Sequence, residues 1–227
     1  MHIPSATFPI RWRLALLASH LVVALVALVV IGGATRVMEA GLACPDWPLC
    51  YGSFFPGSQM NIQVFLEWFH RLDAFLVGIA LLVQFVVALR FKSKLPDWLI
   101  WMYGFLLLLV VLQAGLGALT VLNLLPSVIV TAHLVLALTL VALMSAISQR
   151  LLQSHTAPVP TWWKHMGFGS LLLVIAQALI GGRMSSTWAS KKCLIQGDSC
   201  LLLDLHRISA IPITLFILMF LSAAVLK

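Results

Sequence analysis

Long apolar runs without a charged side chain alternate with short charged segments along this chain. The runs cover residues 14–35, 74–89, 98–149, 165–182 and 208–226. A helix needs about 20 residues to cross the hydrocarbon core of a bilayer, so the longest run must hold two helices, separated near residues 123–127. The second and sixth helices extend backwards through their charged starts. The pattern predicts six transmembrane helices, at residues 14–35, 66–89, 98–121, 127–149, 164–183 and 204–226.

The composition agrees with a membrane location. Of the 227 residues, 62% are hydrophobic and 9% are charged, and the mean hydropathy is +1.06. Soluble domains average about 45–50% apolar and about 25% charged residues. We therefore predict an all-α integral membrane protein in contact with membrane lipid. The first run is longer than the roughly 7–15-residue apolar core of a cleaved signal peptide, which favours a retained first helix.

Lysine and arginine are distributed unequally between the two ends of the predicted helices, and they favour the cytoplasmic side. The larger group comprises Arg11, Arg13, Arg90, Lys92, Lys94, Arg150, Lys164 and Lys227. The opposite end has Arg36, Arg183, Lys191 and Lys192. This predicts a multi-pass protein of the cell inner membrane with a cytoplasmic N-terminus. The net charge of +7 then lies mostly beside anionic lipid, and nucleic-acid binding is not expected.

All four cysteines lie in loops predicted to face outwards, as the close pairs Cys44 with Cys50 and Cys193 with Cys200. That compartment is oxidising, so each pair can close a small disulfide ring. Such a ring can stiffen its loop or exchange with the thiols of a partner. A zinc site is the weakest alternative, because no histidine stands beside the cysteines.

The cysteine pairs belong to an internal repeat. GGATRVMEAGLAC begins at Gly32 and GGRMSSTWASKKC begins at Gly181, and each is followed by a second cysteine, an acid and a His-Arg pair, in EWFHRLDA and LDLHRISA. Four helices separate equivalent elements, so both copies should point the same way across the membrane. We predict an N-terminal four-helix bundle at residues 1–155 and a partial second copy of two helices at residues 156–227.

Small and amide side chains accompany these motifs. The glycine pairs would let helices, or a flat porphyrin, approach closely, and helix packing alone suffices to explain them. Gln113 and Gln177 are expected to hydrogen bond across helices.

Three histidines are expected at one depth, near the outer face of the bilayer. His70 and His206 begin the second and sixth predicted helices, and His133 lies about two turns into the fourth. Ionisable groups in a membrane are costly and usually functional. Neutral imidazole is a natural axial ligand of haem iron, and His70 with His133 is the favoured pair. A transition-metal site would need a further ligand, for which only Glu67 is available.

Charged side chains stand next to these histidines. Glu67 lies three residues before His70, so both side chains share one helix face. A carboxylate beside a haem could move protons or stabilise a cationic intermediate. Arg71 and Arg207 could pair with haem propionates, or they could simply extend to the membrane interface.

The motifs GGATRVMEAGLACPDWPLCYG and QVFLEWFHRLDA, with His133 after a short turn and the second cysteine pair before His206, resemble those of the bacterial haem A synthases. That family is related to the mitochondrial enzyme of cytochrome oxidase assembly. The resemblance implies two four-helix halves, each with a histidine pair and a disulfide-bearing outer loop. It implies oxidation of the C8 methyl of haem O to the formyl of haem A, with haem b as a second prosthetic group.

The resemblance also implies roles for individual residues. His70 and His133 would hold the haem of the N-terminal half, the substrate site, with Glu67 as the catalytic acid and Cys44 with Cys50 as its loop pair. His206 would be one ligand of haem b. The implied partners are a haem O synthase, an electron donor or acceptor, and further copies in a homo-oligomer.

Members of that family have two more helices, one of which supplies the partner of the histidine at the position of His206. This sequence stops at Lys227, and His206 has no evident partner in it. We expect a truncated form or a short natural variant. Completion of the site by another subunit, or loss of the second haem, would also explain the pattern.

Other classes of protein fit part of the pattern. A quinone-linked thiol oxidase would use the cysteine pairs but gives no reason for histidines at matching depth. A bis-histidine cytochrome for electron transfer would use the histidines and leave Glu67 without a task. A transporter has only the repeat in its favour. Replacing Glu67 by Gln separates these classes, because a synthase should keep haem and lose conversion.

Overall fold

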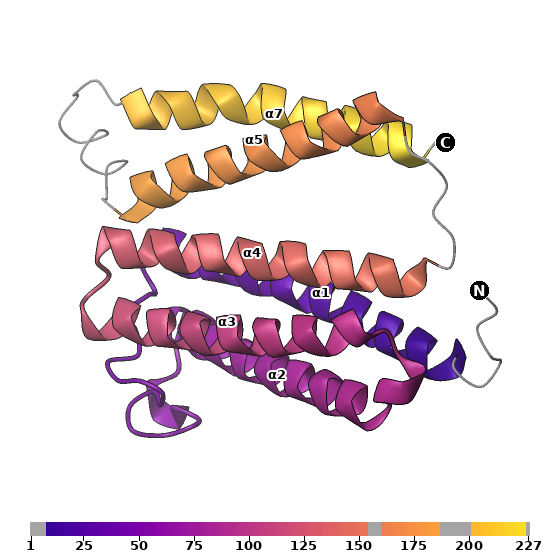
Figure 1. The fold of residues 1–227 in the computed structure, drawn as a ribbon. Helices are drawn as coiled ribbons and strands as arrows, with labels where there is room; N and C mark the ends of the chain where they lie inside the picture. Colours follow the sequence, from indigo (N-terminus) through magenta and orange to yellow (C-terminus); the bar gives the residue numbers. More distant parts are fainter. Residues whose placement is uncertain (1–7, 154–159, 187–200, 226–227) are drawn as a thin grey trace. The chain divides into compact units, whose positions relative to one another are not determined.

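The computed structural model describes residues 8–153, 160–186 and 201–225, which form six long helices (Figure 1). These are α1 Phe8–Val37, α2 Ile62–Arg90, α3 Asp97–Leu122, α4 Ser127–Leu152, α5 Thr161–Ser186 and α7 Leu201–Val225. Two short 3₁₀ helices, η1 Gly57–Gln59 and η2 Lys92–Lys94, lie in the connections. Six helices in this part of the chain are long and apolar enough to span a membrane, so the predicted fold class is confirmed.

The second helix begins earlier than predicted because a side-chain cap sets its start. The Asn61 side chain accepts hydrogen bonds of 3.0 Å from the backbone N–H groups of Gln63 and Val64, which satisfies two donors that a helix start leaves open. The helix therefore starts at Ile62 rather than at residue 66. As a result His70 lies two turns inside α2 and not at its beginning.

The predicted break between the third and fourth helices is confirmed. Leu124 and Leu125 both adopt the left-handed backbone conformation, with φ of 57° and 62°. The N–H of Leu125 donates to the carbonyl of Thr120 at 2.7 Å, which closes the end of α3. Pro126 follows and precedes α4, so the chain turns back within a few residues.

Contacts divide the chain into two compact units. The first unit comprises residues 1–125 and 136–155, and the second comprises residues 126–135 and 156–227. The start of α4 thus groups with α5 and α7, whereas the rest of α4 packs with α1, α2 and α3. The predicted domain boundaries, residues 1–155 and 156–227, stay a prediction. In the structure, α4 is divided between the two units.

Packing and polar contacts hold the first unit together. Its core is built of apolar side chains from α1, α2, α3 and α4, among them Leu14, Leu81, Leu99 and Met144. The guanidinium of Arg11 donates to the carbonyls of Arg150, Leu151 and Gln153, which ties the start of α1 to the end of α4. The hydroxyls of Ser19 and Ser148 lie 2.8 Å apart and join the same two helices.

In the second unit, α5 and α7 lie side by side (Figure 1). The rings of Trp163 and Phe220 lie 4.6 Å apart between their centroids. A Cβ atom at Gly182 would come within 2.9 Å of Leu134 of α4, so this glycine lets the start of α4 approach α5 closely.

Candidate functional site

His70 packs directly against a glycine of the neighbouring helix. A Cβ atom at Gly32 of α1 would lie 2.9 Å from Cε1 of His70 and 3.6 Å from each of its ring nitrogens. The imidazole therefore occupies the space that this glycine leaves, and it is half-buried. Any larger residue at position 32 would displace the ring.

His206 has the same kind of contact in the second unit. A Cβ atom at Gly181 of α5 would lie 2.8 Å from Cε1 of His206 and 3.3 Å from Nε2. The backbone carbonyl of His206 accepts a hydrogen bond of 2.7 Å from Nε2 of Gln177, and the hydroxyl of Ser209 donates to Oε1 of Gln177 at 2.8 Å. The predicted interhelical hydrogen bonding of Gln177 is confirmed, whereas that of Gln113 remains a prediction.

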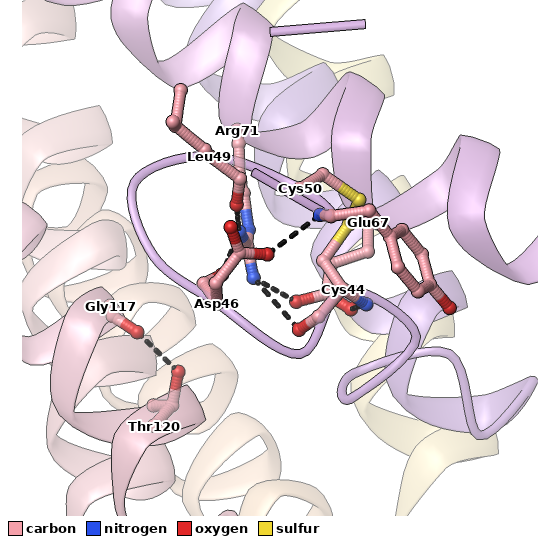
Figure 2. Close-up of polar contacts among 9 residues, drawn as sticks. Cys44, Asp46, Leu49, Cys50, Glu67, Arg71, Gly117 and Thr120 are labelled. Carbon is pink, nitrogen blue, oxygen red and sulfur yellow. Dashed lines mark hydrogen bonds and ion pairs between the residues drawn. A yellow bond between two sulfur atoms is a disulfide. The ribbon is translucent and has the colours of Figure 1, made fainter. Parts of the chain in front are cut away.

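Glu67 is buried at the base of the loop that follows α1. Its side chain is 5% exposed. Oε2 accepts a hydrogen bond of 2.8 Å from the backbone N–H of Cys44, and Oε1 forms an ion pair with Arg71 (Figure 2). Both carboxylate oxygens thus have donors, one from the loop and one from the next turn of α2.

The loop is closed by a disulfide between Cys44 and Cys50. Both cysteines are buried, and they pack with Val64 of α2. The carboxylate of Asp46 accepts hydrogen bonds from the N–H groups of Tyr51 at 2.7 Å and Gly52 at 2.8 Å. The loop is therefore a compact ring attached to α2, as predicted for this cysteine pair. Cys193 and Cys200 lie outside the described residues.

Arg71 makes its contacts with this ring. Its guanidinium donates to the carbonyls of Asp46 at 2.6 Å, Leu49 at 2.5 Å and Cys44 at 3.5 Å, besides pairing with Glu67 (Figure 2). A contact of Arg71 with haem propionates stays a prediction. The carbonyl contacts could not be predicted from the sequence, because backbone carbonyls are present at every residue.

His133 lies in the second turn of α4 and is half-buried. Its segment belongs to the second unit, in which the adjacent Leu134 packs against Gly182. Pairing of His133 with His70 would join residues of the two units and remains a prediction. Among the described residues, no three His, Cys, Asp or Glu side chains gather as a metal ion would require.

The surroundings of His206 lack an acid at the position that Glu67 holds beside His70. Leu203 stands three residues before His206 and is buried, whereas Asp204 is exposed. The acids in EWFHRLDA and LDLHRISA therefore occupy different faces of their helices. Arg207 is also exposed.

The histidine environments fit axial ligands of a haem. Each of two imidazoles is half-buried and packed against a glycine, so its position is set by the helix crossing. Nδ1 of His206 is buried without a hydrogen-bond partner among the described residues. Imidazole nitrogen is a common haem ligand.

Comparison with known proteins gives a consistent set of relatives. The family model COX15-CtaA, described as cytochrome oxidase assembly protein, matches residues 14–227. Haem A synthase of Shewanella oneidensis is 30% identical over 184 residues, which cover 73% of this chain and 54% of that protein. Haem A synthase of Exiguobacterium sibiricum is 24% identical over 190 residues, 80% of this chain and 62% of that protein.

A relative with a different name matches a shorter segment. Protohaem IX farnesyltransferase of Haloarcula marismortui is 40% identical over 63 residues, which cover 28% of this chain and 13% of that protein. The matched regions span less than two thirds of the length of each of these three relatives.

Proposed function

Because this chain belongs to the COX15-CtaA family of cytochrome oxidase assembly proteins, we propose that it acts as a membrane haem A synthase. The reaction is oxidation of the C8 methyl of haem O to the formyl of haem A. The observation that carries the proposal is the buried Glu67 one turn before His70, which itself packs against Gly32. A carboxylate beside an imidazole in a water-poor site is suited to proton transfer next to a bound porphyrin.

His70 and His133 would hold the substrate haem, and His206 would be one ligand of haem b. Haem b, when bound, would supply one-electron chemistry. The protein's own contribution at these positions is to orient the imidazoles, which the glycines at positions 32 and 181 allow. A haem held by two histidines, with no proton-transferring side chain nearby, would favour electron transfer. The acid one turn before His70 therefore favours conversion of haem O at the His70 site.

Glu67 would manage protons at the substrate. The resemblance implies successive hydroxylations of the methyl group to a geminal diol. Loss of water from that diol gives the formyl group and is assisted by an acid. The Cys44 N–H and Arg71 hold the carboxylate in one position. The carboxylate therefore loses no further conformational freedom when the reaction takes place. In the second unit Leu203 stands in the corresponding position, which suits a haem that is bound but not converted.

The cell inner membrane, with the N-terminus in the cytoplasm and the Cys44–Cys50 loop outside, is the proposed location. The charge bias of the loops supports this orientation. A haem O synthase is the proposed supplier of substrate, and the segment shared with a protohaem IX farnesyltransferase supports a link to enzymes of that class. An electron donor or acceptor and a homo-oligomer complete the proposed partners.

The direct test is Glu67→Gln in the full chain, purified in lipid nanodiscs and supplied with haem O. We expect the haem spectrum to persist while haem A formation falls by about 100-fold or more, because an amide cannot transfer the proton. Asp204→Asn is the control, since Asp204 is the exposed acid next to His206. Wild-type conversion by the Glu67→Gln protein would show that Glu67 is not the catalytic acid. A wild-type protein that binds haem but forms no haem A would favour an electron-transfer cytochrome, and absence of bound haem would redirect attention to the cysteines.

A further inference from the structure

Arg71 is the common partner of the disulfide ring and of Glu67. Its guanidinium reaches the carbonyls of Cys44, Asp46 and Leu49, and it also pairs with the Glu67 carboxylate. Its side chain is 14% exposed. The N–H of Cys44, which belongs to the same ring, donates to the other oxygen of this carboxylate.

The arrangement of these acceptors depends on the ring being closed. The three carbonyls come from different residues of one short loop, and they converge on one guanidinium. Guanidinium is a planar group with five N–H donors in fixed directions, so it can bind several acceptors only when these are already in place. Hydrogen bonds from a charged donor are also stronger than those between neutral groups. Closing the disulfide therefore favours the Arg71 contacts, and by linkage the Arg71 contacts favour the closed disulfide.

We propose that Arg71 is a positioning residue that couples the Cys44–Cys50 disulfide to the carboxylate of Glu67. When the ring is closed, Arg71 is fixed by the loop and in turn fixes Oε1 of Glu67, while the ring supplies the Cys44 N–H to Oε2. When the ring opens, the carbonyls separate and both donors to Glu67 lose their fixed positions. The catalytic consequence of this coupling rests on the proposed role of Glu67.

The coupling can be measured without haem or activity. Reduced dithiothreitol supplies two electrons and two protons to the disulfide and becomes a cyclic disulfide itself. The full-length protein in nanodiscs is equilibrated over a series of reduced-to-oxidised dithiothreitol ratios. Thiols are then alkylated, and the peptide that contains Cys44 and Cys50 is scored by mass spectrometry, which keeps it distinct from Cys193 and Cys200.

In Arg71→Gln we expect half-reduction at a ratio about tenfold lower than in the wild type, equivalent to roughly 30 mV for this two-electron couple. Arg71→Lys, which keeps the charge but not the planar fork, should lie between the two. Arg13→Gln is the control, because Arg13 is an exposed arginine of the same unit at the opposite end of α1. An equilibrium within twofold of the wild type in both Arg71 variants would overturn the proposal.

Kinetics with haem O then test the consequence for Glu67. Arg71→Gln and the double change Cys44→Ser with Cys50→Ser should each lower kcat by a similar factor and leave KM nearly unchanged. Their combination should lower kcat little further, because both remove the same coupling. A raised KM with unchanged kcat would identify Arg71 as a substrate contact and overturn the coupling to Glu67. If the wild type forms no haem A while the dithiothreitol shift is observed, the proposed function fails and the Arg71–disulfide linkage stands.

Discussion

The helix pairs α1–α2 and α5–α7 each pack a histidine against a glycine, but they differ in the side chain that stands one turn before that histidine. His70 packs against Gly32, and His206 packs against Gly181, with nearly equal distances of closest approach, 2.9 Å and 2.8 Å to the Cβ position. Around His70 the structure adds a buried carboxylate, whereas around His206 it has Leu203 and a hydrogen bond from Gln177 to the histidine backbone.

The difference separates two requirements that a haem site combines. Holding an imidazole in a fixed position needs a close helix crossing, which a single glycine provides. Handling protons needs a further side chain one turn away, with its own donors, and that part can be changed without moving the histidine. The predicted repeat would produce a glycine–histidine contact in both helix pairs. Glu67, which stands only beside His70, would make the two sites differ in chemistry.

Filling the glycine positions should have the largest effect. A Leu side chain at Gly32 or at Gly181 would displace the neighbouring imidazole, so we expect each change to reduce haem binding at that histidine by about tenfold or more. The measurement is a reduced-minus-oxidised spectrum with haem quantification by pyridine extraction. Comparison of the two variants shows which absorption belongs to which histidine.

Gly33→Leu is the matched control for this experiment. Gly33 is adjacent in sequence, it is exposed, and a Cβ atom there would meet nothing within 4 Å. Its haem content should equal that of the wild type. Full haem content in Gly32→Leu and Gly181→Leu would show that the glycine contacts do not set the ligand positions.

Introducing the missing acid should have the next largest effect. Leu203→Glu would place a carboxylate at the position equivalent to Glu67. Arg207 stands four residues later, as Arg71 does after Glu67, but it is exposed. A buried charge without partners costs about 3 kcal/mol or more, so we expect a clearly lower melting temperature in a thermal unfolding assay. Leu203→Met is the control for the change of shape. A melting temperature near that of the wild type would mean that the second unit has donors of its own for such a carboxylate.

Part of this comparison could be predicted from the sequence, and the reasons are physical. A membrane-spanning helix must be apolar, so the uncharged runs reveal the six long helices of the described residues. Helix starts were less accurate, because a single cap such as Asn61 sets them. The glycine pairs were noted for close packing, but uniformly apolar helices do not reveal which face meets which neighbour.

The remaining differences concern the positions of the acids and of Arg71. Asp204 was matched to the acid before His70 by order along the chain, although its spacing from His206 places it on another face of the helix. The partners of Arg71 are backbone carbonyls, which have no signature in a sequence. The offset of the acids is visible in the sequence as two residues before His206 against three before His70. The contacts of Arg71, by contrast, depend on how the loop folds.

The smallest expected effects come from two glutamines inside the helix packing, the half-buried Gln177 and the buried Gln84, and should differ in sign. The side chain of Gln177 is hydrogen bonded to His206 and Ser209, so Gln177→Leu should lower stability by about 0.5–1.5 kcal/mol, as for other hydrogen bonds between membrane helices.

Gln84 of α2 is 1% exposed, and its amide nitrogen and oxygen have no hydrogen-bond partner among the described residues. Gln84→Leu should therefore raise stability by about 1 kcal/mol, because it removes two buried polar atoms that gain nothing in the fold. Melting temperatures of both variants, each compared with the wild type in the same lipid, check the two signs. A loss of stability in Gln84→Leu would show that its amide is satisfied in the bilayer, for example by an internal water molecule.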